Sequence, residues 1–432
     1  MLLDDAFDPE SLPDGSLIVA KLTDQGDHQL FHFWPESGKL EPLPAFITSA
    51  DNGTPLRGSP DGKEIVYFGT GGPETRSQSP NIYVFDLTSH MSRRLLPGAE
   101  ISPPMTLAPD GRLAYATAAV GDLKQLVSVP RQGSGSRRVL MSFPSNVGPG
   151  SIDLARDGSL YVDQQPTLHS GVRFTEGGGA AFLGEEPVVW LSNGDFAFTE
   201  KQGGKSHLMV QHAGAQPHML LQTTEESNGP AADVPGGMIA FVLGSGDERH
   251  IALATLRDGR VMRRFAPPAA AVTSIAATPD ASQLFFSSGG HIWAQPIAGG
   301  EPRQITAGAD AAIDTAGQFL YVKRNEKGII KLFRTSLAGS DAQELLMPSE
   351  YHLAAPALSP SAIDSKGRIL MTVISAHSYY YHAAIFDPRT KDLRLPLDFD
   401  GDVSRPAWLP DGRIGAAAQR YTSSLWRYRP VN

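Results

Sequence analysis

Short runs of β-branched and aromatic residues recur along the whole chain, each just after a signal for a tight turn. Ile65–Tyr67 and Leu284–Phe286 are examples, and each is followed by a second apolar run, Ile82–Phe85 and Ile292–Ala294. A more polar run then closes the unit, as in Arg303–Thr306, where basic residues are typical of an exposed sheet edge. Because runs of this composition favour strands, the pattern predicts successive four-stranded antiparallel sheets.

The turns that open these units are regularly spaced. Most have Asp or Asn before Gly, a pair that tolerates the positive φ of tight antiparallel turns. The turn positions are Gly15, Gly62, Gly111, Gly158, Gly194, Gly237, Ala281, Gly317, Gly367 and Gly412. Their mean spacing is about 44 residues, the period of a propeller blade. We therefore expect an all-β protein, a β-propeller built from about ten four-stranded repeats of roughly 44 residues.

Ten repeats exceed the four to eight blades of most propellers, so one large ring and two tandem propellers both stay open. The polar stretch from Gln222 to Asp233 suggests a division into repeats 1–5 over 1–222 and repeats 6–10 over 223–432, with a single propeller over 1–432 as the alternative. The fourth unit has no clean third strand in His169–Gly184. The last unit stops after a third strand at Leu425–Tyr428, so we expect the residues before Gly15 to close the ring.

The motif Ser59-Pro60-Asp61-Gly62, followed by Ile65–Tyr67 and Ile82–Phe85, resembles the WD-like propeller repeat of the TolB-type family, found in bacterial sensors and envelope proteins. The resemblance covers nearly the whole chain and implies the propeller fold. It implies little about function, because the same repeat occurs in scaffolds, peptidase gating domains and sugar-processing enzymes. The separate α/β domain that precedes the TolB propeller has no counterpart here.

Charge and composition exclude several functions. The 432 residues include 37 Lys and Arg against 46 Asp and Glu, a net charge of −9, with no basic run longer than two residues. Nucleic acid is therefore not an expected partner. The chain has no Cys, which excludes disulfides, thiolate metal sites and a cysteine nucleophile. Neither a signal peptide nor a membrane-spanning segment is evident, so we expect a soluble protein, periplasmic if part of an envelope or receptor protein and otherwise cytoplasmic.

Candidate binding residues gather in the loops between second and third strands, which share one face of a propeller. Arginine and tyrosine can anchor a peptide there, and aromatic rings can stack on a sugar. The predicted ligand-binding residues are Arg76, Arg249, His250, His291, Arg324, His377, Tyr379, Tyr380, Tyr381 and His382.

Motifs for catalysis and metal binding are missing from the sequence. It has no Gly-x-Ser-x-Gly elbow, no Walker motif and no His-Glu-x-x-His. Asp398, Asp400 and Asp402 resemble the start of a calcium loop, but Val403 stands where that loop needs Gly, so no metal and no cofactor are expected.

These observations favour a non-enzymatic recognition module that binds a protein, peptide or small ligand through one loop face, as the sensor part of a larger bacterial protein. Protein or peptide is the expected partner, with carbohydrate as a further option. The alternative is a carbohydrate-active enzyme, a polysaccharide lyase or glycoside hydrolase, with its site in the central pocket. Whether the protein is an enzyme stays open at this point.

Overall fold

The computed structural model describes residues 3, 6–22, 28–47, 56–72, 80–96, 101–120, 123–131, 136–144, 147–212, 215–221, 223–269, 271–326, 329–375, 378 and 380–429. These residues form antiparallel strands and one 3-10 turn, η1 (Gly246–Glu248). Within those ranges, no helix has the length and apolar character needed to cross a membrane. The prediction of an all-β protein made of four-stranded antiparallel sheets is confirmed.

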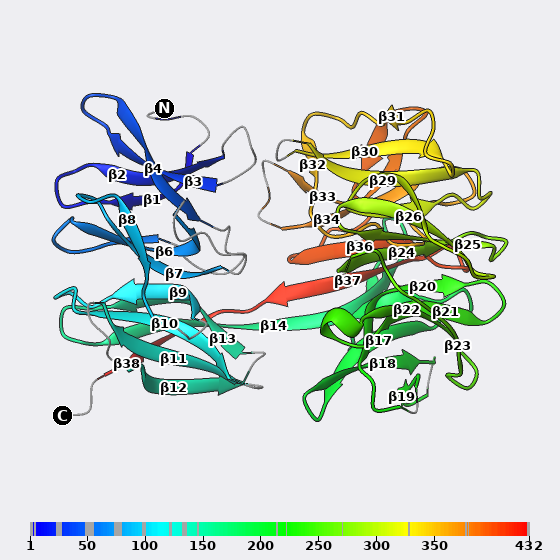
Figure 1. The fold of residues 1–432 in the computed structure, drawn as a ribbon, viewed down its shortest axis with the longest axis horizontal. Coiled ribbons are helices and arrows are strands. Elements are labelled where there is room, and N and C mark those ends of the chain that lie inside the picture. Colours follow the sequence, from blue (N-terminus) through cyan, green and yellow to red (C-terminus); the bar gives the residue numbers. More distant parts are fainter. Residues whose placement is uncertain are drawn as a thin grey trace. The chain divides into compact units, whose positions relative to one another are not determined.

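The chain divides into two compact units, whose strands are labelled in Figure 1. The smaller unit comprises Met1–Thr167 and Tyr421–Asn432, and the larger unit comprises Leu168–Arg420. The halves predicted from the sequence, 1–222 and 223–432, divide the chain elsewhere and remain a prediction.

The smaller unit contains three sets of four consecutive strands. The first two sets join into one eight-stranded sheet because β4 also pairs with β6. Their strands are β1 (Ala6–Ser11), β2 (Leu17–Leu22), β3 (His28–Trp34), β4 (Lys39–Ile47), β5 (Leu56–Gly58), β6 (Glu64–Gly71), β7 (Asn81–Asp86) and β8 (Met91–Arg94). The third set is β9 (Ser102–Leu107), β10 (Leu113–Val120), β11 (Leu123–Pro130) and β12 (Arg138–Pro144).

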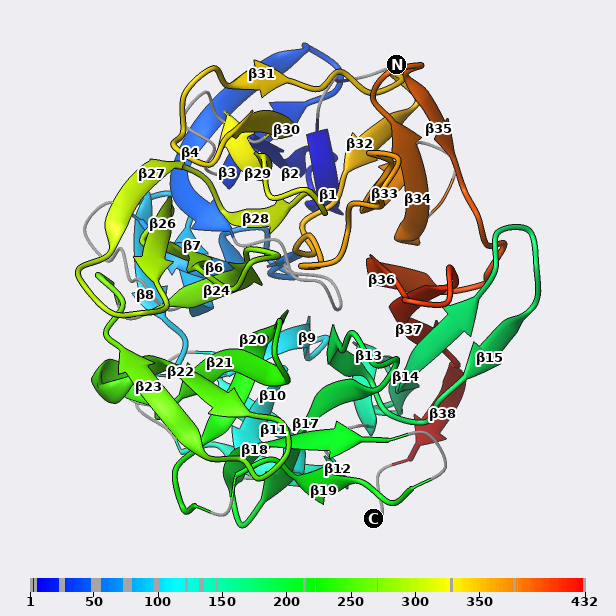
Figure 2. The ribbon, with the colours of Figure 1, turned by 90° about the vertical axis from the view of Figure 1, so that its right-hand side faces the viewer.

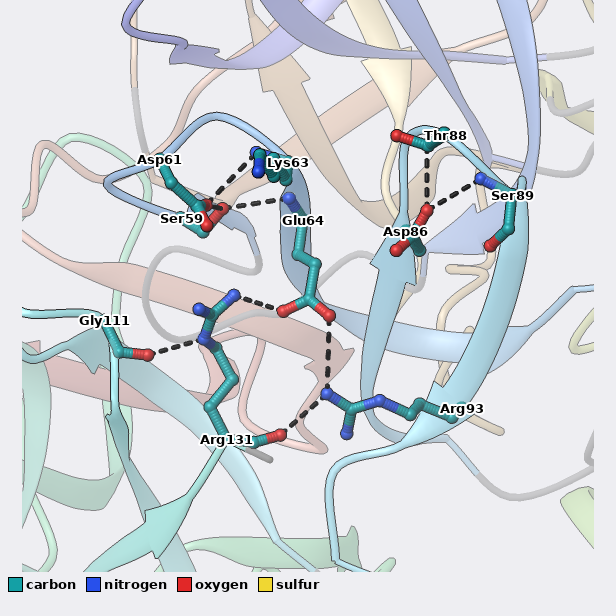
Figure 3. A network of polar contacts seen from close by, with 10 residues as sticks. All are labelled: Ser59, Asp61, Lys63, Glu64, Asp86, Thr88, Ser89, Arg93, Gly111 and Arg131. Carbon is teal, nitrogen blue, oxygen red and sulfur yellow. Dashed lines mark hydrogen bonds and ion pairs between the residues drawn. The ribbon is translucent and has the colours of Figure 1, made fainter. Parts of the chain in front are cut away.

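A buried arginine fastens two sheets of the smaller unit together (Figure 3). Arg131, which follows β11, forms an ion pair with Glu64 at the start of β6 and donates through Nε to the carbonyl of Gly111 at 2.5 Å. Arg93 of β8 donates to the Arg131 carbonyl at 2.7 Å. Since the Arg131 and Glu64 side chains are only 8% and 13% exposed, the pair is held in a setting with little screening by water.

The larger unit contains five sheets of four consecutive strands. They are built from β16 (Pro187–Trp190), β17 (Phe196–Gln202), β18 (Lys205–Gln211) and β19 (His218–Met219); β20 (Ser227–Val234), β21 (Met238–Leu243), β22 (His250–Thr255) and β23 (Val261–Phe265); β24 (Val272–Ala277), β25 (Gln283–Ser288), β26 (His291–Pro296) and β27 (Arg303–Ala307); β28 (Asp310–Ile313), β29 (Phe319–Glu326), β30 (Ile329–Ser336) and β31 (Gln343–Glu344); and β32 (Tyr351–Leu353), β33 (Ile369–Ser375), β34 (His382–Asp387) and β35 (Asp392–Arg394).

A sixth sheet of the larger unit draws strands from two distant parts of the sequence. β36 (Asp402–Trp408) pairs with β37 (Ile414–Tyr421), β37 with β14 (Leu160–Phe174), and β14 with β15 (Ala180–Phe182). In the smaller unit, the first half of β14 pairs instead with β13 (Val147–Leu154) and β38 (Ser424–Tyr428). The fifteen-residue strand β14 therefore contributes to a sheet in each unit.

This pairing corrects two expectations about closure. Leu425–Tyr428 lies in β38 and pairs with residues 160–164 of β14, so it is not the third strand of the last unit. The strand before Gly15, β1, pairs with β2 and closes nothing at the C-terminal end. The physical reason is that the segment from Leu160 to Phe174 stays extended without a turn, which lets it supply the missing strand of the β36–β37 sheet.

The six sheets of the larger unit, as far as the structure describes them, follow one another around a closed ring (Figure 2). A separate apolar cluster fills each junction between neighbouring sheets, including the junction of the last with the first. Members from the two sides of each junction are Leu208 and Phe241, Val242 and Phe286, Phe285 and Leu320, Leu332 and Met371, Ile385 and Ile414, and Ala407 and Trp190. Burial of these side chains stabilises the ring.

The predicted turn positions all lie between the first and second strands of a sheet. Each of them has a positive φ, from +54° at Ala281 to +87° at Gly194. An alanine in this left-handed region is uncommon, so the repeat imposes the turn geometry even where glycine is missing. The turn signals that organised the sequence are therefore confirmed at the level of the backbone.

Candidate functional site

A pocket of about 630 Å³ opens at one end of the ring in the larger unit. Its walls come from all six sheets, at the points where each first strand ends and turns into the second. We call it the mouth pocket. Its size lies within the range of small-ligand sites. Because strands of one sheet alternate in direction, this mouth is at the opposite end of the strands from the loops that carry the predicted binding residues.

Two tryptophans shape the wall at the junction of the first and sixth sheets. Trp190 ends β16 and is 5% exposed, and Trp408 ends β36. An arginine lies over each ring: Arg173 at 5.0 Å from the Trp190 centroid and Arg368 at 4.7 Å from that of Trp408. These cation–π contacts fix the position of both rings in the wall.

Apolar side chains and prolines make up much of the remaining wall. Leu191, Ile313, Ile363 and Leu409 lie in the wall, and the Pro residues of three turns frame it, Pro279, Pro360 and Pro410. Pro fixes φ and thus limits the movement of these turns. The wall of the mouth pocket therefore combines apolar surface with hydroxyl and charged groups.

Asp233, near the end of β20, is the polar group in this wall with the least support. Its Oδ2 accepts a hydrogen bond from the backbone N–H of Ser192 at 3.1 Å. Its Oδ1 is buried and accepts no hydrogen bond. Burial raises the pKa of Asp233, because the hydration that an ionised carboxylate loses there outweighs the hydrogen bonds that Ser192 donates from its side chain and backbone. A buried Trp408 Nε1 in the same wall also lacks an acceptor.

The other charged groups of the pocket differ in how they are neutralised. Asp364 accepts from Arg368 Nε at 2.7 Å, so these two charges compensate each other. Asp314 uses Oδ1 to accept the backbone N–H groups of Gln318 and Phe319, both at 2.7 Å. Within the described part of the chain, neither Asp233 nor Asp314 forms an ion pair.

Of the predicted binding residues that the structure describes, Arg249, Tyr380 and Tyr381 lie in connections between second and third strands. His250, His291 and His382 begin third strands, and Arg324 lies in the second strand β29, so the binding role of the set stays a prediction. His250 Nδ1 lies 2.7 Å from the Glu248 carbonyl and His291 Nδ1 lies 3.0 Å from that of Gly289. Arg324 donates to Thr306 Oγ1 at 2.7 Å and lies over the ring of Phe333 at 4.3 Å. Arg249 is exposed. The contacts of His250 and His291 lie within their own loops. Arg324 donates across to β27 of the preceding sheet and lies over a ring of its own sheet.

The tyrosine cluster packs against the start of β36. The backbone N–H of Tyr381 donates to Asp402 Oδ1 at 2.7 Å, and that of Tyr380 to Ser378 Oγ at 3.1 Å. The negative charge of Asp400 raises the pKa of Tyr380, and burial lowers the pKa of His382. Arg76, His377 and Tyr379, also predicted as binding residues, lie outside the described residues.

Sequence reasoning missed the mouth pocket, although the signal for it was present. The Asp-Gly and Asn-Gly turns were interpreted as hairpin connections alone. In the closed ring these turns converge, and their neighbours Asp314, Asp364 and Pro410 line one cavity. No sequence pattern states which ends of the strands surround a hollow, because that depends on packing across sheets. In the described ranges, no group of three or more His, Asp or Glu residues could hold a metal ion.

The ring of antiparallel sheets belongs to the β-propeller class, and the chain resembles TolB-like and protease propeller domains. It is similar to a protein assigned as TolB from Agrobacterium tumefaciens, with 17% identity over 59% of this chain and 99% of that chain and a TM-score of 0.46. It is also similar to the tricorn protease, with 11% identity, a TM-score of 0.36 and coverage of 97% of this chain but 58% of that chain. The Dos1 propeller matches with 10% identity over 87% of this chain and 94% of that chain, with a TM-score of 0.31.

No family model matches the chain, and no curated protein matches it. At these identities the likeness concerns the propeller fold alone.

Proposed function

We propose that this protein is a non-enzymatic recognition module whose larger unit binds a small ligand, or the end of a peptide, in the mouth pocket. The observation that carries the proposal is the pocket itself, which measures about 630 Å³ and is walled by six sheets. Its wall holds the Asp364–Arg368 ion pair beside two buried polar atoms without a hydrogen-bond partner among the described residues, Asp233 Oδ1 and Trp408 Nε1. An apolar hollow with a few convergent polar groups is the usual form of a small-ligand site. A role as the sensor part of a larger bacterial protein accords with this arrangement.

A fragment screen by thermal shift tests the proposal, because a ligand that binds only the native state raises its stability, by about 2.7 kcal/mol at a hundredfold excess over Kd. The blocking variant is Thr315→Trp, since Thr315 lies in an exposed turn of the pocket wall and a large ring there fills the hollow without entering the core. The control is Thr390→Trp, in an exposed turn outside the pocket.

We expect fragments that stabilise the wild type and Thr390→Trp but not Thr315→Trp. Fragments that stabilise Thr315→Trp equally, and lose their effect in Arg249→Ala or Tyr380→Ala, would move the site to the predicted loop face. A screen without any hit on the wild type would contradict small-ligand binding and leave a protein partner at the loop face as the remaining proposal.

The carbohydrate-active alternative needs two carboxyl groups, or a Tyr and Arg pair, that converge on one bond. The pocket wall offers Asp233, Asp314 and Asp364, of which Asp364 is held by Arg368. Incubation with a panel of oligosaccharides, followed by detection of new reducing ends or unsaturated products, distinguishes catalysis from binding. Product formed by the wild type and not by Thr315→Trp would favour the enzyme.

A further inference from the structure

The charges around the mouth pocket are unequal in number and in placement. The wall contains three carboxylates, Asp233, Asp314 and Asp364, and two cationic side chains, Lys366 and Arg368. Arg368 is committed to Asp364 through the 2.7 Å contact and covers the Trp408 ring. With that pair compensated, the cationic side chain that remains in the described wall is that of Lys366, which is exposed.

The two remaining carboxylates come from the same side of the ring. Asp233 lies one residue before the end of β20, and Asp314 follows β28. The sheet that begins with β24 lies between them in sequence order and contributes Ala277 and Pro279 to the wall. This stretch of the wall therefore carries negative charge next to apolar surface. Apolar surroundings strengthen the attraction of a cation, because water screens the charges less there.

The hydrogen bonds of Asp233 also favour a cation at this part of the wall. Ser192 donates to this carboxylate from its backbone and its side chain, and Oδ1 has no donor, while the side chain as a whole lies in the pocket wall. This carboxylate therefore lacks a counter-charge, and one of its two oxygens lacks a donor. An ammonium group supplies both, whereas a neutral hydroxyl supplies only a donor and an anion supplies neither.

We propose that the mouth pocket recognises an ammonium group attached to an apolar body, with Asp233 as the main counter-charge, Asp314 as a second one and Leu191, Ile313 and Leu409 as the surface for the apolar part. This inference rests on the proposed function, since it assigns a ligand class to the same pocket. A free amine and the amino end of a peptide carry the same chemistry, and both are tested below.

Three ligands of nearly the same shape separate the effect of charge: phenethylamine, 2-phenylethanol and 3-phenylpropionate. Binding to the whole chain is measured by isothermal titration, with the fluorescence of the pocket tryptophans as a second readout. We expect phenethylamine to bind about tenfold or more tightly than the other two, because a charge-assisted hydrogen bond contributes more than a neutral one. The dipeptide amide Phe-Ala-NH2 and its acetylated form show whether a peptide amino end is accepted.

Substitutions then locate the counter-charge. Asp233→Asn keeps the acceptor for the Ser192 N–H and removes the charge, so phenethylamine should bind about tenfold more weakly. Asp314→Asn should reduce binding by a smaller factor. Asp392→Asn, in the exposed end strand β35, is the matched control and should bind like the wild type.

Each outcome has a definite meaning. Equal or tighter binding of 2-phenylethanol or 3-phenylpropionate, or unchanged binding in Asp233→Asn, would overturn the cation assignment while leaving the pocket as a binding site. If none of the three ligands binds but fragments still discriminate Thr315→Trp, the assignment is likewise wrong and the proposed function stands. Failure of both experiments would overturn both proposals.

Discussion

Two charged residues of the larger unit are buried in quite different ways, and each makes a separate contribution to stability. Asp233 lacks a donor for Oδ1, whereas Lys323 is almost completely satisfied. Lys323 Nζ donates to the carbonyls of Ala354 and Pro356, both at 2.7 Å, and lies 3.5 Å from Asp310 Oδ2. Burial of Asp233 therefore destabilises the fold, whereas Lys323 links β29 to the segment after β32.

The first prediction concerns pH. Burial raises the pKa of Asp233 above its value in the unfolded chain, so the native state binds a proton that the unfolded state has released. The free energy of unfolding therefore falls as the pH rises from about 4 through the native pKa and is constant above it. We expect Asp233→Asn to remove this fall and to be more stable than the wild type at neutral pH.

Urea unfolding between about pH 4 and pH 7, followed by tryptophan fluorescence, measures this effect. Asp392→Asn is the control, since its side chain is exposed and should leave the pH profile unchanged. An Asp233→Asn variant that keeps the wild-type pH slope, or is less stable at neutral pH, would show that the carboxylate is well supported after all.

The second prediction concerns Lys323, which is 2% exposed. Burial lowers the pKa of Lys323 and raises that of Asp310, so both charges depend on each other. Lys323→Met leaves Asp310 as a buried charge without its partner and should lower the free energy of unfolding by about 3–5 kcal/mol.

Lys331→Met provides the comparison, because Lys331 forms only surface ion pairs with Glu326 and Glu344. Surface pairs contribute little, so stability should change little there. A similar decrease in the free energy of unfolding in both variants would indicate that the contacts of Lys323 do not hold β29 and the segment after β32 together.

At the scale of elements, the closing junction of the ring depends on a glycine. Gly415 of β37 lies against Trp190 of β16, and a Cβ at this position would overlap the indole ring. Gly415→Ala must displace the tryptophan, and overpacking of this kind costs about 1–3 kcal/mol. We expect a lower urea midpoint and altered tryptophan fluorescence.

Gly179→Ala is the matched control, since a Cβ there meets no atom and its φ is not in the left-handed region. It should behave like the wild type within error. If both variants unfold alike, the junction between the sixth and first sheets is looser than the packing of Trp190 indicates.

Elements also show how far the sequence alone could lead. The period of the turns predicted the four-stranded sheets and the positive φ of Gly194, Ala281 and Gly412 correctly, because local chemistry decides both features. The pairing partner of each strand was harder to predict from the sequence. The long strand β14 and the short β38 carry ordinary strand sequences, and no local signal states that they pair with each other.

For the candidate site, too, local features were easier to predict than contacts between distant parts of the sequence. Arg249 lies in the connection between β21 and β22, as strand order predicted, whereas His291 begins β26 and Arg324 lies in β29. Their role in binding stays a prediction. The mouth pocket was missed, because Asp233 and Asp314 are far apart in sequence and meet one cavity only when six sheets close into a ring.

At the scale of the whole molecule, the larger unit has two faces that carry different sets of loops. One face has the turns between first and second strands and contains the mouth pocket. The other face has the loops between second and third strands and the predicted binding residues. Both proposals place the ligand at the first face.

Hydrogen–deuterium exchange of the full chain, with and without the tightest ligand from the screen, tests this claim most directly. We expect slower exchange in peptides that cover the turns at 191–195, 233–237, 313–318, 360–368 and 408–412, with no change around Arg249, His291, Arg324 and Tyr380. Protection confined to those loops, with the turns unaffected, would contradict the account and return the site to the loop face.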